Sequence, residues 1–194
     1  DLHSFPTRRS SDLRLSSNFN IYTHNAPQYF TRATNYIPYF WNEREGEKVS
    51  VSLRQYTFNE KRISDIACCV LNSSIFYFWF IVLSDCRHLN AREVDGFPIG
   101  AENIKLSNAK LLIQKLGCLM KDYEEKKNRK EVYYKNTGKA IYDEYYPKLS
   151  KPIIDEIDKV LAKHYGFTEE ELDFIINYDI KYRMGDELNE SVVE

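Results

Sequence analysis

A polar segment at residues 84–99, SDCRHLNAREVDGFPI, concentrates side chains that could contact phosphate groups. Its hydrogen-bond donors follow one another closely and are Arg87, His88, Asn90 and Arg92. Arginine forms charge-assisted hydrogen bonds with phosphate oxygens, and asparagine also donates to them. The only acidic residues within this short stretch that could compete are Asp85, Glu93 and Asp95. We therefore expect Arg87, His88 and Arg92 to contact phosphates of a nucleic acid, with Asn90 beside them.

A second group of possible binding residues lies between residues 29 and 62, where Tyr and Phe are interspersed with Arg, Lys, Ser and Asn. Aromatic rings can stack on nucleic-acid bases, and basic side chains can reach phosphates or base edges. Here we predict base-edge contacts from Arg32 and Arg54 and a further DNA contact from Lys48. For most individual tyrosines the alternative is favoured, namely that the ring belongs to the hydrophobic core.

The sequence contains no recognised catalytic motif. It lacks the phosphate-binding patterns G-x-G-x-x-G and G-x-x-x-x-G-K-[ST], the nucleophile motif G-x-S-x-G, the zinc motif H-E-x-x-H and the motif N-P-P-Y. Asp122, Glu124 and Lys126 are spaced like residues of a nuclease site, but they lie in a charge-rich segment where such spacing arises by chance. The histidines outside the first thirteen residues are far apart in sequence. These residues alone therefore indicate no catalysis.

The composition limits how the chain could bind a polyanion. Lys and Arg number 27 against 29 Asp and Glu, which gives a formal net charge of -2. Binding to nucleic acid would therefore depend on a local cluster of cations and not on the total charge. The four cysteines show no C-x-x-C spacing, so a zinc site and a disulfide framework are both disfavoured. We expect a reducing, cytoplasmic environment.

The first thirteen residues, DLHSFPTRRSSDL, have no helical or alternating apolar pattern. The string resembles the in-frame translation of a widely used short-read sequencing adapter at every position. We therefore expect residues 1–13 to be an artefact and the natural sequence to start at Arg14, in the middle of a longer gene.

The apolar pattern predicts strands first and a helix after them. Residues 19–58 are rich in Tyr, Phe, Thr and Val, and the pattern alternates through Val49, Val51 and Leu53. A turn is expected in NEREGE at Gly46. From Lys61 the apolar residues recur at steps of three and four, which predicts one long helix that ends near Ser84. Its run SIFYFWFIVL, residues 74–83, is about half as long as a membrane-spanning helix needs, so we expect it to be buried in the core.

Two further helical regions are predicted. Ser107 can cap a helix with a heptad-like apolar stripe formed by Ala109, Leu112, Leu116, Leu119 and Tyr123, and the charged run KDYEEKKNRKE is expected to continue this helix into solvent. Pro152 can occupy the first turn of another helix, which ends at Gly166. Thr168 and Glu171 form a capping box for the helix that follows. The outer faces of this last pair are mostly acidic, which disfavours insertion into a DNA groove.

Three segments together resemble the target-recognition region of type IIG restriction-modification DNA methyltransferases, which are adenine-specific enzymes. The segments are L-N-S-S at Leu71 to Ser74, S-D-x-R-H-L-N at Ser84 to Asn90, and F-P-I at Phe97 to Ile99. The stretch SKPIIDEIDKVLAKHYGFTEEELDFIINYDIKYRMG resembles the C-terminal end of the same family, so the resemblance covers most of the chain from Arg14 to Gly185.

We expect an α+β fold, a small mixed recognition domain in which the strands of residues 29–58 pack on the helix of residues 61–83, followed by a mostly helical C-terminal region. The resemblance implies how the chain is divided. Residues 14–100 would be the C-terminal part of a DNA target-recognition domain, 101–147 connecting helices, 148–186 a helical hairpin and 187–194 a tail. The partners implied are double-stranded DNA and a methyltransferase domain of the same protein upstream, with no membrane. S-adenosylmethionine would bind to that missing domain, and no cofactor is expected in this fragment.

Two alternatives remain open. The F-P-I element followed by a heptad-like helix is similar to the specificity subunits of type I restriction systems, which read DNA and carry no catalytic site of their own. From a different class of function, the chain would be a helical interaction module whose stripe from Ala109 to Tyr123 docks on a partner protein. In that case the segment with Arg87 and Arg92 would not matter.

Overall fold

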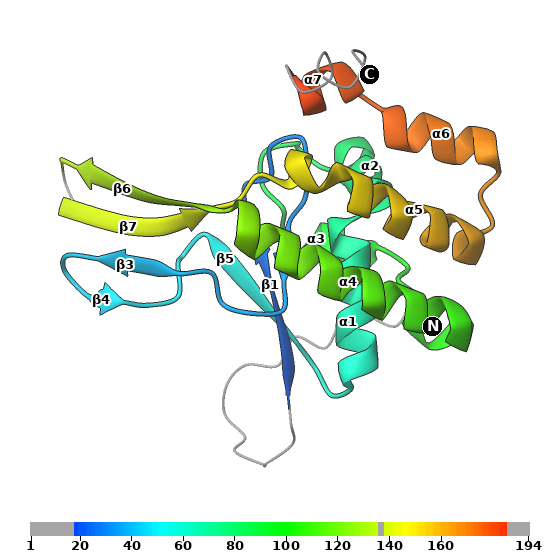
Figure 1. Cartoon of the computed structure of the whole chain (residues 1–194), viewed down its shortest axis with the longest axis horizontal. Coiled ribbons are helices and arrows are strands. Elements are labelled where there is room, and N and C mark those ends of the chain that lie inside the picture. Colours follow the sequence, from blue (N-terminus) through cyan, green and yellow to red (C-terminus); the bar gives the residue numbers. More distant parts are fainter. Residues whose placement is uncertain (1–17, 136–137, 186–194) are drawn as a thin grey trace.

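The computed structural model describes residues 18–135 and 138–185 and has an α+β fold (Figure 1). Helices form one side of the molecule, and a sheet of four strands projects from the other side as an arm. The expected artefact at residues 1–13 and the expected tail at 187–194 lie outside the described residues. The predicted fold class is therefore confirmed.

The first sheet is antiparallel, in the order β2-β1-β5, and packs against the helices. Its strands are β1 (Phe19–His24), β2 (Ala33–Thr34) and β5 (Leu53–Phe58). The predicted strand pattern through Val49 and Val51 is wrong, because both side chains are exposed and a turn closes there. In that turn the N–H of Leu53 donates to the carbonyl of Ser50. The strand begins only after it.

The predicted single helix at 61–83 is in fact two helices, α1 (Lys61–Asn72) and α2 (Ser74–Leu83), bent by 65°. Ser73 lies between them in extended conformation, and its Oγ accepts the N–H of Phe76, which caps α2. Because the side chain of Ser73 accepts a backbone N–H from the first turn of α2, Ser73 starts the second helix and does not continue the first. Among the described residues no single helix has the length and composition to cross a membrane. Of the helices in this part of the chain, only α1 and α2 taken together, as a bent pair, have that length and composition.

The run at residues 74–83 is buried in its first half, as predicted, and emerges at its end. Phe76 and Phe80 lie in the core, whereas Val82 and Leu83 are exposed. The last turn of α2 leads into the polar segment of residues 84–90 and into α3 (Ala91–Gly96).

The helix α4 (Leu106–Lys126) buries the predicted stripe from Ala109 to Tyr123 against α1 and α5 (Lys151–Tyr165) of the same chain. It begins at Leu106 after Lys105 and a short 3₁₀ turn, η1 (Ala101–Asn103), so Ser107 is not its cap. Because the stripe lies in the core, it offers no surface to a partner protein.

The charged run does not continue α4, contrary to the sequence prediction. The helix ends at Lys126, and β6 (Asn128–Tyr134) pairs with β7 (Gly138–Glu144) in a hairpin. The nearly buried carboxylate of Asp143 on β7 binds Lys127 and Arg129, which come from the same charged run. Cross-strand pairing and these ion pairs therefore override the helical pattern.

The second sheet has the order β4-β3-β7-β6 and forms the arm. It joins β6 and β7 to β3 (Phe40–Asn42) and β4 (Gly46–Glu47), with Phe40 opposite Tyr142. The turn predicted at Gly46 is confirmed, since this glycine has a φ of 75°. The sheet and the core both include residues from either side of position 100, so the predicted segments 14–100 and 101–147 pack as one unit.

The C-terminal hairpin follows the prediction closely. After η2 (Pro147–Ser150), α5 has Pro152 in its first turn and ends at Gly166. The capping box of Thr168 and Glu171 starts α6 (Glu169–Asn177). A last short helix, α7 (Ile180–Met184), was not predicted.

The buried side chain of Asn72, at the end of α1, connects three elements. Its Oδ1 accepts the N–H of Ala33 at 3.1 Å and the hydroxyl of Tyr123 at 3.0 Å. Its Nδ2 donates to the carbonyls of Ala33 and Cys68, both at 2.8 Å. The amide thus pairs with β2 as a strand would and also binds α4.

We predict that Asn72→Ala lowers the free energy of unfolding by about 3–5 kcal/mol, because both backbone groups of Ala33 and the hydroxyl of Tyr123 lose buried partners. Urea unfolding followed by circular dichroism measures this loss. Asn59→Ala, at an exposed position, is the matched control and should change stability by less than about 0.5 kcal/mol. Equal stability of the two variants would contradict the role given to Asn72.

Candidate functional site

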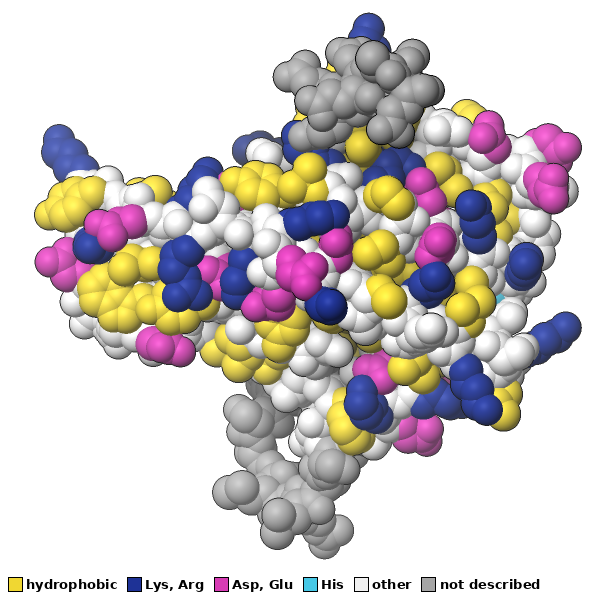
Figure 2. All heavy atoms as spheres, in the orientation of Figure 1, with side chains coloured by type: hydrophobic (Ala, Val, Ile, Leu, Met, Phe, Trp, Pro, Cys, Tyr) yellow, Lys and Arg dark blue, Asp and Glu magenta, His cyan; other side chains and the backbone are white. Residues whose placement is uncertain are grey.

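A groove of about 720 Å³ lies where the arm meets the body of the molecule. Its walls come from the loop after β1, the strands β3, β6 and β7, and the short helix α7. Many of its lining residues are aromatic, and they include the tyrosines Tyr29, Tyr39, Tyr134, Tyr142, Tyr145 and Tyr182. Figure 2 shows hydrophobic side chains, a class that includes tyrosine, gathered on the arm. Ring-lined grooves with nearby cations suit planar, anionic ligands such as nucleotides.

Arg32, one of the predicted base-edge residues, lines this groove. Its guanidinium lies 4.5 Å from the centre of the Tyr145 ring, a cation–π contact. Burial lowers the pKa of Arg32, while the neighbouring tyrosines, Tyr123 first among them, oppose that shift. Its Nη1 has no hydrogen-bond partner among the described residues. The structure therefore places a largely buried cation in the groove wall, stacked on a tyrosine ring.

The acidic side chains of the groove already have cationic partners. Asp143 binds Arg129 at 2.7 Å and Lys127 at 2.9 Å, and Glu144 binds Lys130 at 2.6 Å. Burial raises the pKa of Asp143, but its bonds to Arg129 and Lys127 outweigh burial, so the pKa lies below its ordinary value. The negative charges of both carboxylates are therefore balanced by the paired lysine and arginine side chains. For this reason they do not make the groove repel anions.

The segment that bears Arg87 and His88 is bonded to the loop after β1, which also contributes residues to the groove. The Oδ1 of Asp85 accepts the N–H groups of Arg87 and His88 at 2.9 and 3.1 Å. These bonds hold the pKa of Asp85 below its ordinary value. The N–H of Leu89 donates to the carbonyl of Asn25 at 2.9 Å, next to His24, which lines the groove. Asp85 is engaged by backbone N–H groups, and the side chains of Arg87 and His88 are exposed.

Asn90 and Arg92, predicted with them, have mainly structural contacts. Asn90 is the N-cap of α3, and its N–H donates to the Glu93 carboxylate at 2.9 Å. Arg92 forms two hydrogen bonds with the same buried carboxylate, at 2.7 and 3.1 Å. Glu93 therefore competes with any phosphate for Arg92. In the sequence alone, Glu93 is visible only as an acidic neighbour of Arg92.

The remaining predicted residues do not line the groove. Lys48 follows β4 and binds Glu45 at 2.7 Å. Arg54 lies on β5 opposite Thr23, and its charge acts on Tyr56 and Asp95. Burial raises the pKa of Asp95, and Arg54 opposes this shift. Since Asp95 belongs to α3, the charge of Arg54 acts on that helix.

The residue that holds α7 in the groove wall was not predicted from the sequence. Arg183 is 2% exposed, and its guanidinium donates to the carbonyl of Tyr29 at 3.0 Å, to the carbonyl of Ile176 at 3.2 Å and to Ser74 Oγ at 3.2 Å. It also lies over the rings of Phe30 and Tyr77. Nothing in the string KYRMG distinguishes such a buried arginine from a solvated one.

Comparison of the chain with protein-family models, with curated proteins and with solved structures found no match. The described residues contain no group of three or more His, Cys, Asp or Glu side chains placed to hold a metal ion. The groove thus combines aromatic rings with the cationic side chains of Arg32, Lys148 and Arg183 in its lining, and Arg87 and His88 are exposed on a segment bonded to the loop after β1.

A buried carboxylate lies next to the Arg183 anchor. Asp158 on α5 is fully buried, and its Oδ1 accepts the N–H of Ser74 at 2.9 Å at the start of α2. Its Oδ2 has no partner among the described residues. Burial raises the pKa of Asp158 to about 7, although the bonds from Ser74 and Ile75 oppose the shift.

We predict that the stability of the protein falls between pH 4 and pH 7 because of this group. In that range the unfolded chain releases the proton of Asp158, with an ordinary pKa of 3.8, while the folded protein retains it. The stabilising contribution is complete below pH 4 and is lost as the pH rises to 7, with a slope of up to about 1.4 kcal/mol per pH unit.

Urea unfolding at several pH values tests this expectation. Asp158→Asn keeps the oxygen that accepts from Ser74 and should show a flatter pH dependence than the unsubstituted protein. Asp173→Asn, at an exposed position on α6, is the control and should leave the dependence unchanged. Parallel curves for Asp158→Asn and the unsubstituted protein would refute the assignment.

Proposed function

We propose that this chain reads DNA for a site-specific adenine methyltransferase of a restriction-modification system, as its resemblance to the type IIG enzymes implies. The observation that supports this best is the bond from the N–H of Leu89 to the carbonyl of Asn25, which ties the segment with Arg87 and His88 to the chain between the groove residues His24 and Ala26. Phosphate contacts and base contacts can then be made from adjoining surfaces of one rigid unit.

The phosphate part of this proposal depends on Arg87. Its guanidinium is exposed and always charged, and the nearest carboxylate of the loop, Asp85, is engaged by backbone N–H groups. A backbone that is already ordered loses little entropy when the side chain binds, which favours affinity. Because the net charge of the chain is -2, such a local arrangement is what binding to DNA requires.

The proposed division of labour suits a reaction on an extruded base. An enzyme that methylates adenine must grip the duplex with one surface and hold the flipped base in a separate catalytic pocket. This chain would supply the first surface, and a methyltransferase domain of the same protein would supply S-adenosylmethionine binding and N-P-P-Y. The type I specificity subunit remains the alternative, and it shares the same DNA-binding surface.

We predict that Arg87→Ala weakens binding to a random-sequence duplex and reduces the slope of log affinity against log salt by about one, since one phosphate contact fewer releases about one counterion fewer. Fluorescence anisotropy of a labelled duplex of about 20 base pairs, measured from low to moderate salt, gives both quantities. Arg92→Ala should change the slope less, because Glu93 already binds that guanidinium.

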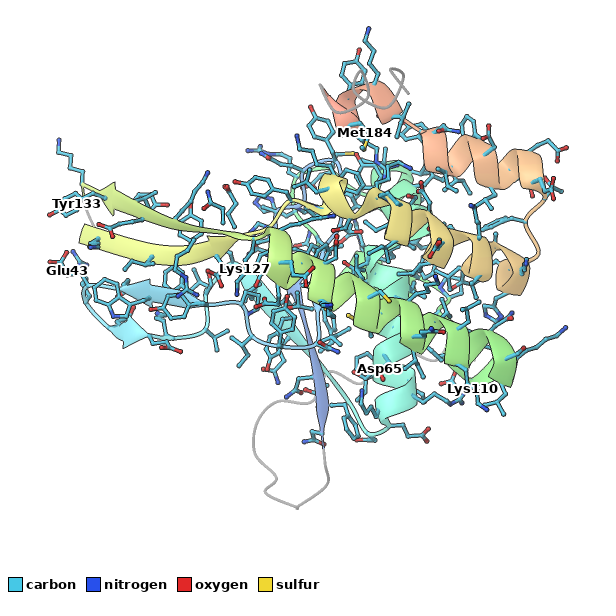
Figure 3. The ribbon with its side chains drawn as sticks, viewed as in Figure 1. Glu43, Asp65, Lys110, Lys127, Tyr133 and Met184 are labelled. Atoms are coloured by element: carbon cyan, nitrogen blue, oxygen red, sulfur yellow. The ribbon has the colours of Figure 1, made fainter. Side chains whose placement is uncertain are left out.

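The control is Lys110→Ala, which removes an exposed cation from the far end of α4. Figure 3 shows Lys110 at the opposite end of the molecule from the arm, where Tyr133 lies. The slope for this variant should equal that of the unsubstituted chain. Equal slopes for Arg87→Ala and Lys110→Ala would refute the phosphate role, and absence of duplex binding by the unsubstituted chain would refute the proposed function.

A further inference from the structure

Three exposed tyrosines from three separate elements line the same groove. Tyr29 follows β1, Tyr134 ends β6 and Tyr182 belongs to α7, and their side chains are exposed by 51%, 50% and 65%. A large aromatic surface left in water is unusual for a residue that serves only the core. Because the three rings come from distant parts of the chain, their convergence is a property of the fold and not of one local segment.

The backbone at Tyr29 adds a second, independent observation. Its φ is 60°, a conformation that bulky residues rarely adopt, and its carbonyl accepts the Nε–H of the buried Arg183. Such strain persists where surrounding contacts enforce it, which is frequent at binding sites. Arg183 thus fixes Tyr29 and the α7 segment that carries Tyr182 relative to each other.

Other rings of the groove are already covered on one face by arginine. Arg129 lies 3.9 Å from the ring centre of Tyr39, and Arg32 lies 4.5 Å from that of Tyr145. No cation–π contact of this kind involves Tyr29, Tyr134 or Tyr182 among the described residues. These three rings are exposed by half or more and therefore have surface left for a planar ligand.

We infer that the groove holds an unpaired nucleobase of the bound DNA, stacked on these tyrosines. The inference rests on the proposed function and names the part of the DNA that enters this site. A paired base within a duplex exposes only its edges, whereas an unpaired base offers its faces for stacking. The volume of about 720 Å³ lies within the range of about 300–1,000 Å³ typical of sites for small organic ligands, and so accommodates a nucleotide.

The charges around the groove agree with this ligand. The phosphates that flank an unpaired base would lie toward the segment of Arg87 and His88, which is bonded to the loop after β1, while Arg32 provides positive charge in the wall. The carboxylates of Asp143 and Glu144 are neutralised by their ion pairs, so they do not oppose the approach of a phosphate. The rings then supply affinity that depends little on base identity, because every base has an aromatic face.

Three labelled duplexes test the inference by fluorescence anisotropy with the full chain. The first is fully paired, the second carries one unpaired thymidine at its centre, and the third carries an abasic nucleotide at that position. The second and third have the same backbone and differ only in the base. We expect the duplex with the unpaired thymidine to bind more tightly than the abasic duplex, by about five- to a hundred-fold for one stacked base.

Two adjacent tyrosines provide matched variants. Tyr134 lines the groove, whereas its neighbour Tyr133 is 78% exposed and does not line it, because successive side chains of a strand point to opposite faces. Tyr134→Leu and Tyr182→Leu should each reduce the preference for the unpaired base several-fold. Tyr133→Leu should retain it in full.

The possible results separate this inference from the proposed function. Equal affinity for the thymidine and abasic duplexes, with the paired duplex bound, would overturn this inference and leave the proposed function intact. No binding to any duplex would overturn the proposed function and this inference with it. A preference that Tyr133→Leu reduces as much as Tyr134→Leu would overturn the assignment of the groove as the site.

Discussion

The buried side-chain amide of Asn72 joins the first sheet to the helices α1 and α4. All of its hydrogen-bonding groups are engaged, with β2 on one side, α4 on another and the last turn of α1 beneath it. A buried amide of this kind is stabilising only when every partner is present, since each lost partner leaves a desolvated polar group. The positions of the first sheet, α1 and α4 are therefore determined together at one residue.

The break that follows Asn72 determines where the groove forms. Ser73 ends α1 and caps α2, so α2 leaves at 65° and brings Ser74 to Asp158 and Arg183. Arg183 then holds α7 against the loop of Tyr29. The short motif N-S-S thus has a structural explanation in each of its residues. This motif is part of the stretch that resembles the methyltransferases, and these contacts give it a role in folding.

Much of the helical structure could be predicted from the sequence, because its signals are local. The stripe of α4 and the capping box of α6 follow from spacing and residue type alone, and both are present. The break at Ser73 could not be predicted, since the apolar period continues across it and no Pro or Gly interrupts it. The strand β6 was missed because its charges suit a solvated helix, and only the distant Asp143 makes them fit a sheet.

The candidate site was predicted in part for the same reason. The sequence grouped Arg87 with Arg92, which are neighbours along the chain, but the competing carboxylate of Glu93 separates their roles. Arg32 was selected from its aromatic surroundings, and it does line the groove. Arg183 and the convergence of Tyr29, Tyr134 and Tyr182 depend on contacts between residues as far apart as β1 and α7, which no local pattern encodes.

The pairing of β3 with β7 has a consequence for how the protein folds during synthesis. Phe40 and Tyr142 face each other across the sheet although roughly 100 residues separate them in sequence. Until the ribosome has released residue 142, the edge of β3 that will bind β7 has no partner, and unpaired strand edges are templates for association with other chains. The hairpin of β3 and β4 is short and carries the charged residues Glu43, Arg44, Glu45 and Glu47. Such charges oppose association of an unpaired strand edge with other chains.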